Sequence, residues 1–243
     1  MESQIENTHS DQHSWIFCLG EILLVFLPAF LFVKITSSWV GEDTTRSFGV
    51  IWVANILMLA MVWTGMKLRG KSWKEFGLTF TAVSPIVGLR IFGLSLLVFV
   101  IGACAFLMGP VLMANIAEIP ESADFSRYDY LKDNLGGLFF TLAGVYIASS
   151  FGEEVIYRAF LINRISELVN STKYSGVIAV LLSSIFFGLI HYEWGPMGMV
   201  QTGLMGLAMG ICYIKLKRRL WILILAHAYL DTLLMVQLYM ASN

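Results

Sequence analysis

Long apolar runs separated by short polar segments dominate the pattern of this sequence. Seven of them are long enough to cross the hydrocarbon core of a bilayer as helices, which takes roughly 20 residues. They lie at residues 15–33, 48–66, 87–107, 138–165, 175–191, 197–214 and 220–240. The acidic stretch 108–136 contains two prolines and leaves room for an eighth crossing only if these boundaries are badly placed. The pattern predicts an all-α, polytopic membrane bundle of about seven helices.

Composition supports a single membrane domain. Hydrophobic residues make up 57% of the chain and the formal net charge is −1, so no basic surface exists to hold nucleic acid. No repeat, low-complexity tract or linker interrupts the pattern between residues 15 and 243. The polar residues 1–14 lack the basic start of a cleavable signal peptide. We expect them to form a disordered cytoplasmic tail.

Charged residues between the runs set the expected orientation. Most Lys and Arg residues fall in the segments 67–82, 166–174 and 215–219, which share one side of a seven-span chain. The positive-inside rule places these segments and the N-terminus in the cytoplasm. We therefore expect a multi-pass protein of the cytoplasmic membrane with its C-terminus outside.

Three ionisable residues interrupt the fourth apolar run. Glu153, Glu154 and Arg158 lie within one helical pattern, with the second and third four residues apart. Each such group facing lipid at the bilayer centre costs about 2.5–3.5 kcal/mol, so the three together would cost roughly 10 kcal/mol. They must face the protein interior or a water-filled cavity. Ionisable residues in such a place are candidates for function.

Two histidines and an aspartate extend this set. His191 ends the fifth run, and His227 and Asp231 lie in the seventh. Glu154 with Arg158 and His227 with Asp231 are spaced by four residues, so each pair shares one helical face. The fourth and fifth runs form a hairpin in which Glu153 and His191 differ in height by roughly 5 Å, at about 1.5 Å per residue. These two side chains are expected to meet.

Glycines in the sixth run indicate close helix packing. Gly203, Gly206 and Gly210 recur at steps of three and four residues, and the last two form a GxxxG motif. Such a face allows two helix backbones to approach closely. Packing inside the bundle is the simpler interpretation, and a dimer interface is the alternative. The sequence leaves the oligomeric state open.

The ionisable motifs together resemble those of a known family. Glu153-Glu154-x-x-x-Arg158, Phe187-x-x-x-His191 and His227-x-x-x-Asp231 follow one another on successive membrane runs. In this order they are similar to the motifs of the CPBP intramembrane proteases. That family includes the type II CAAX prenyl endopeptidases and the bacterial CAAX-protease and bacteriocin-immunity (Abi) proteins. The resemblance covers residues 138–243, and the earlier spans match only in being hydrophobic.

The resemblance implies an intramembrane endopeptidase and a role for each motif. By analogy, Glu153 is the general base on a water molecule shared with His191, and Glu154 pairs with Arg158. The third motif supplies the oxyanion site, here His227 with Asp231. The prenyl endopeptidases carry Asn where this chain has Asp231. Because an ionised Asp cannot donate a hydrogen bond, our hypothesis is that Asp231 accepts one from His227 and favours its imidazolium form.

A metal-dependent mechanism is the alternative. Glu153, His191, His227 and Asp231 are all acceptable zinc ligands, and three suffice for an open catalytic site. The sequence contains no HExxH motif, and the ligands would come from three separate helices. We favour the metal-free mechanism, with a divalent metal such as zinc as the alternative cofactor.

Other functions fit parts of the pattern. A lone membrane histidine or a buried Glu–Arg pair is often purely structural, and a proton-coupled transporter also places acidic residues and histidines in membrane helices. Transporters usually show internal repeats and broken helices, which this sequence lacks. A non-catalytic scaffold or bacteriocin self-immunity protein of the same fold is the stronger alternative. The expected partners are the bilayer and a membrane-associated peptide or protein substrate, which is lipidated in the eukaryotic relatives.

Overall fold

The computed structural model describes residues 2–40, 44–114 and 122–241. Side chains are described from residue 15 onward in the first segment and from residue 48 onward in the second. These residues form helices and turns, and none of them is in a β-strand. The longer helices are α1 (Glu2–Val40), α2 (Thr44–Leu68), α3 (Pro85–Met113), α6 (Ser175–Leu189), α7 (Gly195–Lys215) and α8 (Leu220–Met240). A further continuous helix covers Leu135–Leu168. Short 3₁₀ turns form η1 (Trp73–Phe76), η2 (Ser126–Leu131) and η5 (Tyr192–Trp194).

The predicted class of fold, a polytopic helical bundle, is confirmed. Six helices are long and apolar enough to cross a membrane, and α6 is a shorter apolar helix of 15 residues. All seven occur where the apolar runs predicted them. Between α3 and the Leu135–Leu168 helix, the described residues contain only the short η2 and no eighth crossing. The disordered cytoplasmic tail expected for residues 1–14 stays a prediction.

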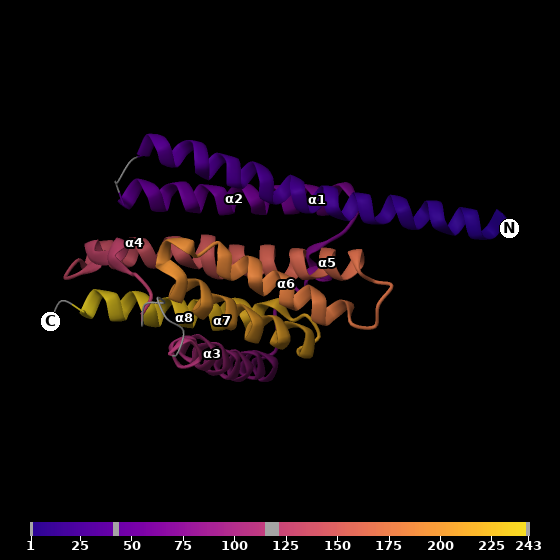
Figure 1. The fold of residues 1–243 in the computed structure, drawn as a ribbon. Helices are drawn as coiled ribbons and strands as arrows, with labels where there is room; N and C mark the ends of the chain where they lie inside the picture. Colours follow the sequence, from indigo (N-terminus) through magenta and orange to yellow (C-terminus); the bar gives the residue numbers. More distant parts are fainter. Residues whose placement is uncertain (1, 41–43, 115–121, 242–243) are drawn as a thin grey trace.

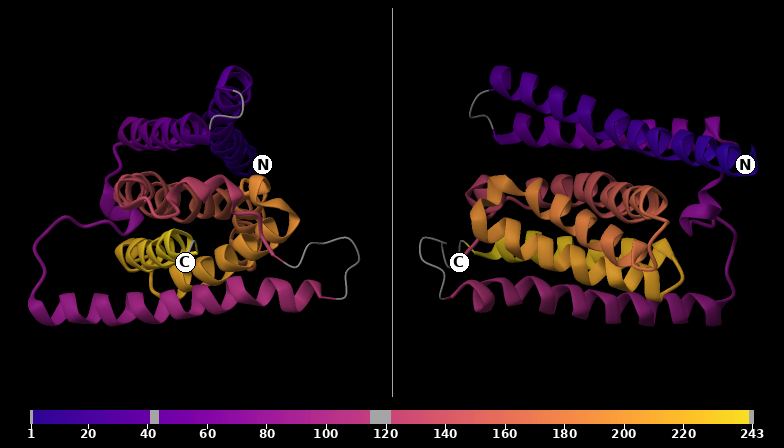
Figure 2. Two further views of the ribbon diagram at one scale, coloured as in Figure 1. Left: turned by 90° about the vertical axis from the view of Figure 1, so that its left-hand side faces the viewer. Right: turned by 45° about the vertical axis from the view of Figure 1, so that its right-hand side comes forward.

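The helices pack in layers (Figures 1 and 2). The antiparallel pair α1–α2 forms one outer layer, and the Leu135–Leu168 helix lies beside α6 in the middle. Next come α7 and α8, and α3 is outermost on the far side, where it packs against both of them. The two chain ends lie at opposite ends of the bundle (Figure 1), as an odd number of crossings requires.

The Leu135–Leu168 helix is not a regular α-helix throughout, which corrects the uniform helical periodicity expected from sequence. Its α-helical ends, α4 (Leu135–Val145) and α5 (Ile162–Leu168), enclose two π-helical segments, η3 (Tyr146–Phe151) and η4 (Glu154–Leu161). In η4 the backbone carbonyl of Tyr157 accepts a hydrogen bond from Ser183 Oγ on α6 at 2.8 Å. Single π-helical turns often occur at functional sites, and here they flank Glu153.

Small residues allow α6 and α7 to cross closely. A Cβ atom added at Gly188 would lie 2.6 Å from the carbonyl oxygen of Met199 and 3.1 Å from the Cα of Gly203. Farther along α7, Gly206 faces the ring of Phe187 and Gly210 faces Val180. The glycine pattern of the sixth run therefore serves packing inside the bundle, as the simpler interpretation predicted.

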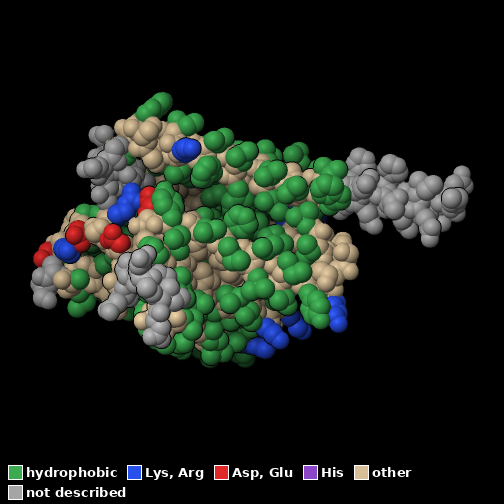
Figure 3. Space-filling view, in the orientation of Figure 1, with side chains coloured by type: hydrophobic (Ala, Val, Ile, Leu, Met, Phe, Trp, Pro, Cys, Tyr) green, Lys and Arg blue, Asp and Glu red, His purple; other side chains and the backbone are tan. Residues whose placement is uncertain are grey.

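The outer surface is apolar over the middle of the bundle (Figure 3). Large hydrophobic side chains such as Phe30, Phe139 and Ile185 are more than half exposed, at 64%, 64% and 56%. Contiguous apolar surface of this extent is unfavourable in water and is typical of a surface that faces lipid. The protein is a multi-pass membrane protein.

Candidate active site

Glu154 is the centre of a buried polar cluster inside the bundle. Its side chain is fully buried, and Oε1 lies 3.1 Å from Nη1 of Arg158, one turn along the same helix. The same oxygen accepts a hydrogen bond from Nδ1 of His227 on α8 at 2.8 Å. The predicted Glu154–Arg158 pair is present, and the structure adds His227 to it. The fourth and seventh predicted spans are thus joined through one carboxylate.

Arg158 connects this cluster to the α6 helix. Its guanidinium lies over the ring of Phe187 with its central carbon 4.2 Å from the ring centroid, a cation–π contact. The Phe187 ring also meets the ring of Tyr157 at 5.2 Å and that of His227 at 6.2 Å. Phe187, the first residue of the second motif, therefore supports the acid–base groups by packing.

Asp231 lies on the other side of His227. Its Oδ1 is 3.7 Å from Nε2 of His227, so the imidazole sits between two carboxylates. Its Oδ2 accepts a hydrogen bond from Ser150 Oγ at 2.7 Å, which anchors the carboxylate to the helix that carries Glu154. Sequence reasoning missed Ser150. Its position four residues before Glu154, as a hydroxyl within an apolar run, was the available signal.

Glu153 is buried beside this arrangement, with 6% of its surface exposed. Charged groups near it include His227, Asp231 and Arg158. Among the described residues it forms no hydrogen bond or ion pair, whereas Glu154 is held through Oε1 by Arg158 and His227, although Oε2 of each glutamate is without a partner. Of the two adjacent carboxylates, Glu153 is the one that no neighbouring side chain holds.

His191 lies just beyond the end of α6. Its Nδ1 is 2.7 Å from the backbone carbonyl of Phe187; because a carbonyl can only accept, this nitrogen carries the proton. In the neutral ring Nε2 then has a free lone pair. No hydrogen bond or ion pair joins His191 to Glu153 in the described part of the chain. The water molecule expected to be shared between the two residues stays a prediction.

The short helix α6 explains the depth of His191. Fifteen residues rise about 22 Å, against a hydrocarbon core of about 30 Å, so α6 ends before it crosses the core. Irregular backbone at such a depth is tolerated only where protein or a cavity surrounds it. Here the Trp194 ring of η5 lies 4.9 Å from the His191 ring.

A segment outside the spans covers this end of the site. In η2, Arg127 forms an ion pair with Glu193, and the buried Tyr128 ring contacts the ring of Trp194 at 6.4 Å. Tyr128 is close enough to Asp231 to feel its charge, and burial raises the pKa of the Tyr128 phenol above its usual range. The sequence did not single out these residues, since nothing local to η2 indicates what it packs against.

The zinc ligands suggested by the sequence are Glu153, His191, His227 and Asp231. The described residues contain no group of three or more His, Cys, Asp or Glu side chains placed to hold a metal ion. Nδ1 of His227 and Nδ1 of His191 are both engaged in hydrogen bonds. As arranged, the four candidate ligands do not fit a three-ligand catalytic site.

The fold and the cluster together define a class of protein: a polytopic helical membrane protein with a buried carboxylate–imidazole site. Residues 135–233 match the family model described as Type II CAAX prenyl endopeptidase Rce1-like. This segment is similar to that family, in agreement with the resemblance to the CPBP intramembrane proteases that the motifs predicted. At the level of the family, the match implies intramembrane CAAX protease activity. No curated protein and no solved structure matches the chain.

Proposed function

We propose that this protein is an intramembrane endopeptidase that hydrolyses a peptide bond in a membrane-associated protein or peptide. The observation that carries the proposal is the carboxylate of Glu153, which has no hydrogen-bond partner among the described residues and is buried beside the Glu154–His227–Asp231 arrangement within the family-matched segment. Peptide hydrolysis needs a base for water, a donor for the oxyanion and a proton for the leaving amine. Each of these three groups has a candidate among the residues of the buried cluster.

Glu153 is the proposed general base. It takes one proton from a water molecule while the water oxygen attacks the substrate carbonyl carbon. The second hydrogen stays on that oxygen and donates a hydrogen bond to the free Nε2 of His191. As the tetrahedral intermediate collapses, Glu153 passes its proton to the departing amine nitrogen. The carboxylate is regenerated and no metal ion is required.

His227 is the proposed oxyanion donor. With Nδ1–H directed at Glu154, the imidazolium form presents Nε2–H on the side of Asp231. Two flanking carboxylates favour the positive charge that the oxyanion needs, and Ser150 holds Asp231 in place. The proposed catalytic set is Glu153, Glu154, Arg158, His191, His227 and Asp231, with Glu154 and Arg158 positioning the others.

The proposed substrate lies in or on the bilayer. A site enclosed by membrane helices is reached most readily by a chain already held in the membrane, including one anchored by a lipid. We place the protein in the cytoplasmic membrane, with its basic segments in the cytoplasm, from the distribution of Lys and Arg between the spans.

The test is cleavage of a membrane-peptide library by purified protein in lipid vesicles. Glu153→Gln keeps the shape of the side chain but removes the base, so we expect loss of at least about 100-fold in turnover. Glu75→Gln, in η1 with a side chain 46% exposed, is the control for loss of a carboxylate and should keep full activity.

The same pair of variants distinguishes the scaffold and immunity alternatives. A non-catalytic scaffold should keep its cellular phenotype in Glu153→Gln, whereas a protease should lose it. Full cleavage by Glu153→Gln would overturn the proposed role of Glu153, and absence of cleavage by the wild-type protein with an intact Glu153→Gln phenotype would support the scaffold.

A further inference from the structure

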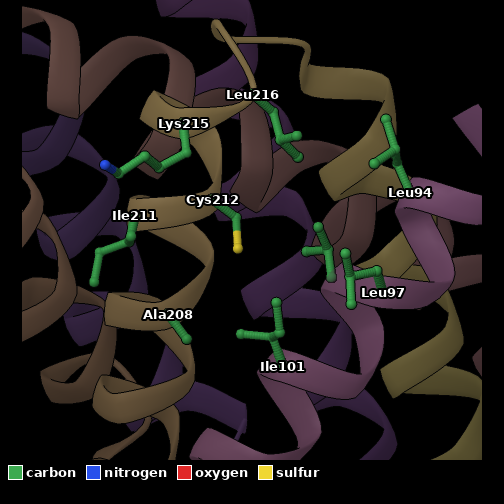
Figure 4. Close-up of a pocket in the computed structure, with 9 residues that line it drawn as sticks. Leu94, Leu97, Ile101, Ala208, Ile211, Cys212, Lys215 and Leu216 are labelled. Carbon is green, nitrogen blue, oxygen red and sulfur yellow. The ribbon is translucent and has the colours of Figure 1, made fainter.

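An apolar cavity of about 450 Å³ lies between α3 and α7 (Figure 4). Leucine and isoleucine side chains of α3 face the gap from one side, and the Cys212 sulfur points into it from α7 (Figure 4). None of the residues assigned to the active site lines it. The cavity is therefore a feature separate from the acid–base cluster.

The cavity opens toward the lipid. α3 is the outermost helix on its side of the bundle (Figure 2), so the groove between it and α7 lies on the membrane-facing surface. Leu97, Ile101 and Ile211 line the groove and are 55%, 39% and 47% exposed. A space of this shape and polarity in a bilayer accommodates a hydrocarbon chain.

Basic residues gather at one end of the groove. A smaller cavity of about 170 Å³ continues it, shares Leu94, Lys215 and Leu216 with it, and is otherwise lined by Arg90, Lys217 and Arg219. Among the described residues no acidic side chain forms an ion pair with any of these four cations. In Figure 3, Lys and Arg side chains gather along the lower right edge of the apolar face.

The turn that carries this charge is held in a defined position. Lys217 and Arg218 adopt left-handed backbone conformations with φ of 54° and 59°, which are uncommon for residues other than glycine. A Cβ atom at Gly77 would lie 1.6 Å from the carbonyl oxygen of Arg218, so the chain after η1 packs directly against the turn. The Trp221 indole N–H also donates to the Thr79 carbonyl at 2.9 Å. The basic groups are thus presented by a packed turn.

We propose that this groove is a binding site for an anionic phospholipid, with an acyl chain between α3 and α7 and the phosphate at Arg90, Lys217 and Arg219. Charge complementarity selects this occupant: the exposed cations attract an anion, and the apolar groove leading from them accommodates a hydrocarbon chain. An acidic phospholipid contains both an anionic headgroup and hydrocarbon chains. Basic pockets between membrane helices on the cytoplasmic side bind such headgroups. The positive-inside orientation places this end in the cytoplasmic leaflet.

The test is native mass spectrometry of the full-length protein released from nanodiscs of equal parts phosphatidylglycerol and phosphatidylcholine. We expect the wild-type protein to retain phosphatidylglycerol preferentially. Lys217→Gln with Arg219→Gln should lower this preference roughly fivefold for each cation removed. The matched control, Lys67→Gln with Lys74→Gln, removes the same charge from exposed positions at the same end that do not line the groove.

The apolar part of the groove has its own test. Ala208→Phe fills the space between the helices and should lower retention of phosphatidylglycerol, whereas Ile214→Phe, exposed on the same helix but outside the groove, should not. Equal retention of both lipids by the wild-type protein would overturn the proposal. Equal losses in the test and control variants would also overturn it, as would a dimer formed through this face in the mass spectrum.

Discussion

The Nδ1 atom of His227 on α8 lies 2.8 Å from Oε1 of Glu154 on the Leu135–Leu168 helix. This hydrogen bond assigns different tasks to the two adjacent glutamates. Glu154 is held through Oε1 by His227 and Arg158, while Glu153 forms no hydrogen bond or ion pair among the described residues. A pair of identical residues is thereby separated into a positioning group and a candidate base.

Replacing Glu154 by Gln should impair catalysis through His227. The amide keeps the size of the side chain but removes the charge that orients and stabilises the imidazolium, so we expect turnover to fall about 100-fold. Turnover of the substrate in vesicles is the measurement. Glu75→Gln, at an exposed position in η1, controls for loss of a carboxylate. Wild-type turnover in Glu154→Gln would show that the bond to His227 plays no part in catalysis.

Replacing Asp231 by Asn tests the departure from the prenyl endopeptidases. Asn can still accept the hydrogen bond from Ser150, so the geometry should survive while the negative charge beside His227 is lost. We expect activity to fall roughly tenfold and the pH–activity profile to change shape. Activity would be followed across the pH range at fixed substrate. If both activity and profile were unchanged, the proposed role of Asp231 would be wrong.

Removing Arg158 should destabilise the bundle. Arg158→Met leaves the fully buried Glu154 without one of its two cations, and breaking a buried ion pair in this way costs about 3–5 kcal/mol. Thermal unfolding in detergent, followed by tryptophan fluorescence, should show a clearly lower midpoint. Lys74→Met removes a charge from an exposed position and should leave the midpoint in place. Equal midpoints for both variants would contradict a structural role for the Arg158 pair.

The crossing of α6 and α7 can be tested with two glycines of the same helix. Gly188→Ala puts a methyl group 2.6 Å from the carbonyl oxygen of Met199, and the resulting overpacking should cost about 1–3 kcal/mol. At Gly176 no atom lies within 4 Å, so Gly176→Ala should be neutral or slightly stabilising. The measurement is the unfolding midpoint of each variant in the same detergent. A Gly188→Ala protein as stable as Gly176→Ala would rule out close backbone contact at this crossing.

The class of fold and the positions of the membrane helices could be predicted from the sequence alone. This was possible because a spanning helix must satisfy its backbone internally and match the bilayer in length, so hydrophobic runs translate directly into helices. It also identified Glu153, Glu154 and Arg158 as candidates, because ionisable groups in such runs are costly. The pairs Glu154–Arg158 and His227–Asp231 followed from helical spacing alone.

Only the tertiary structure decided which motifs meet and how. The bond from His227 to Glu154 and the anchoring of Asp231 by Ser150 join residues more than 70 positions apart in the chain. Helical periodicity describes one face of one helix and carries no information about its rotation against a neighbour. The π-helical turns around Glu153 likewise depend on contacts with other helices, such as the hydrogen bond from Ser183. The groove between α3 and α7 exists for the same reason, since side chains of two separate spans define it.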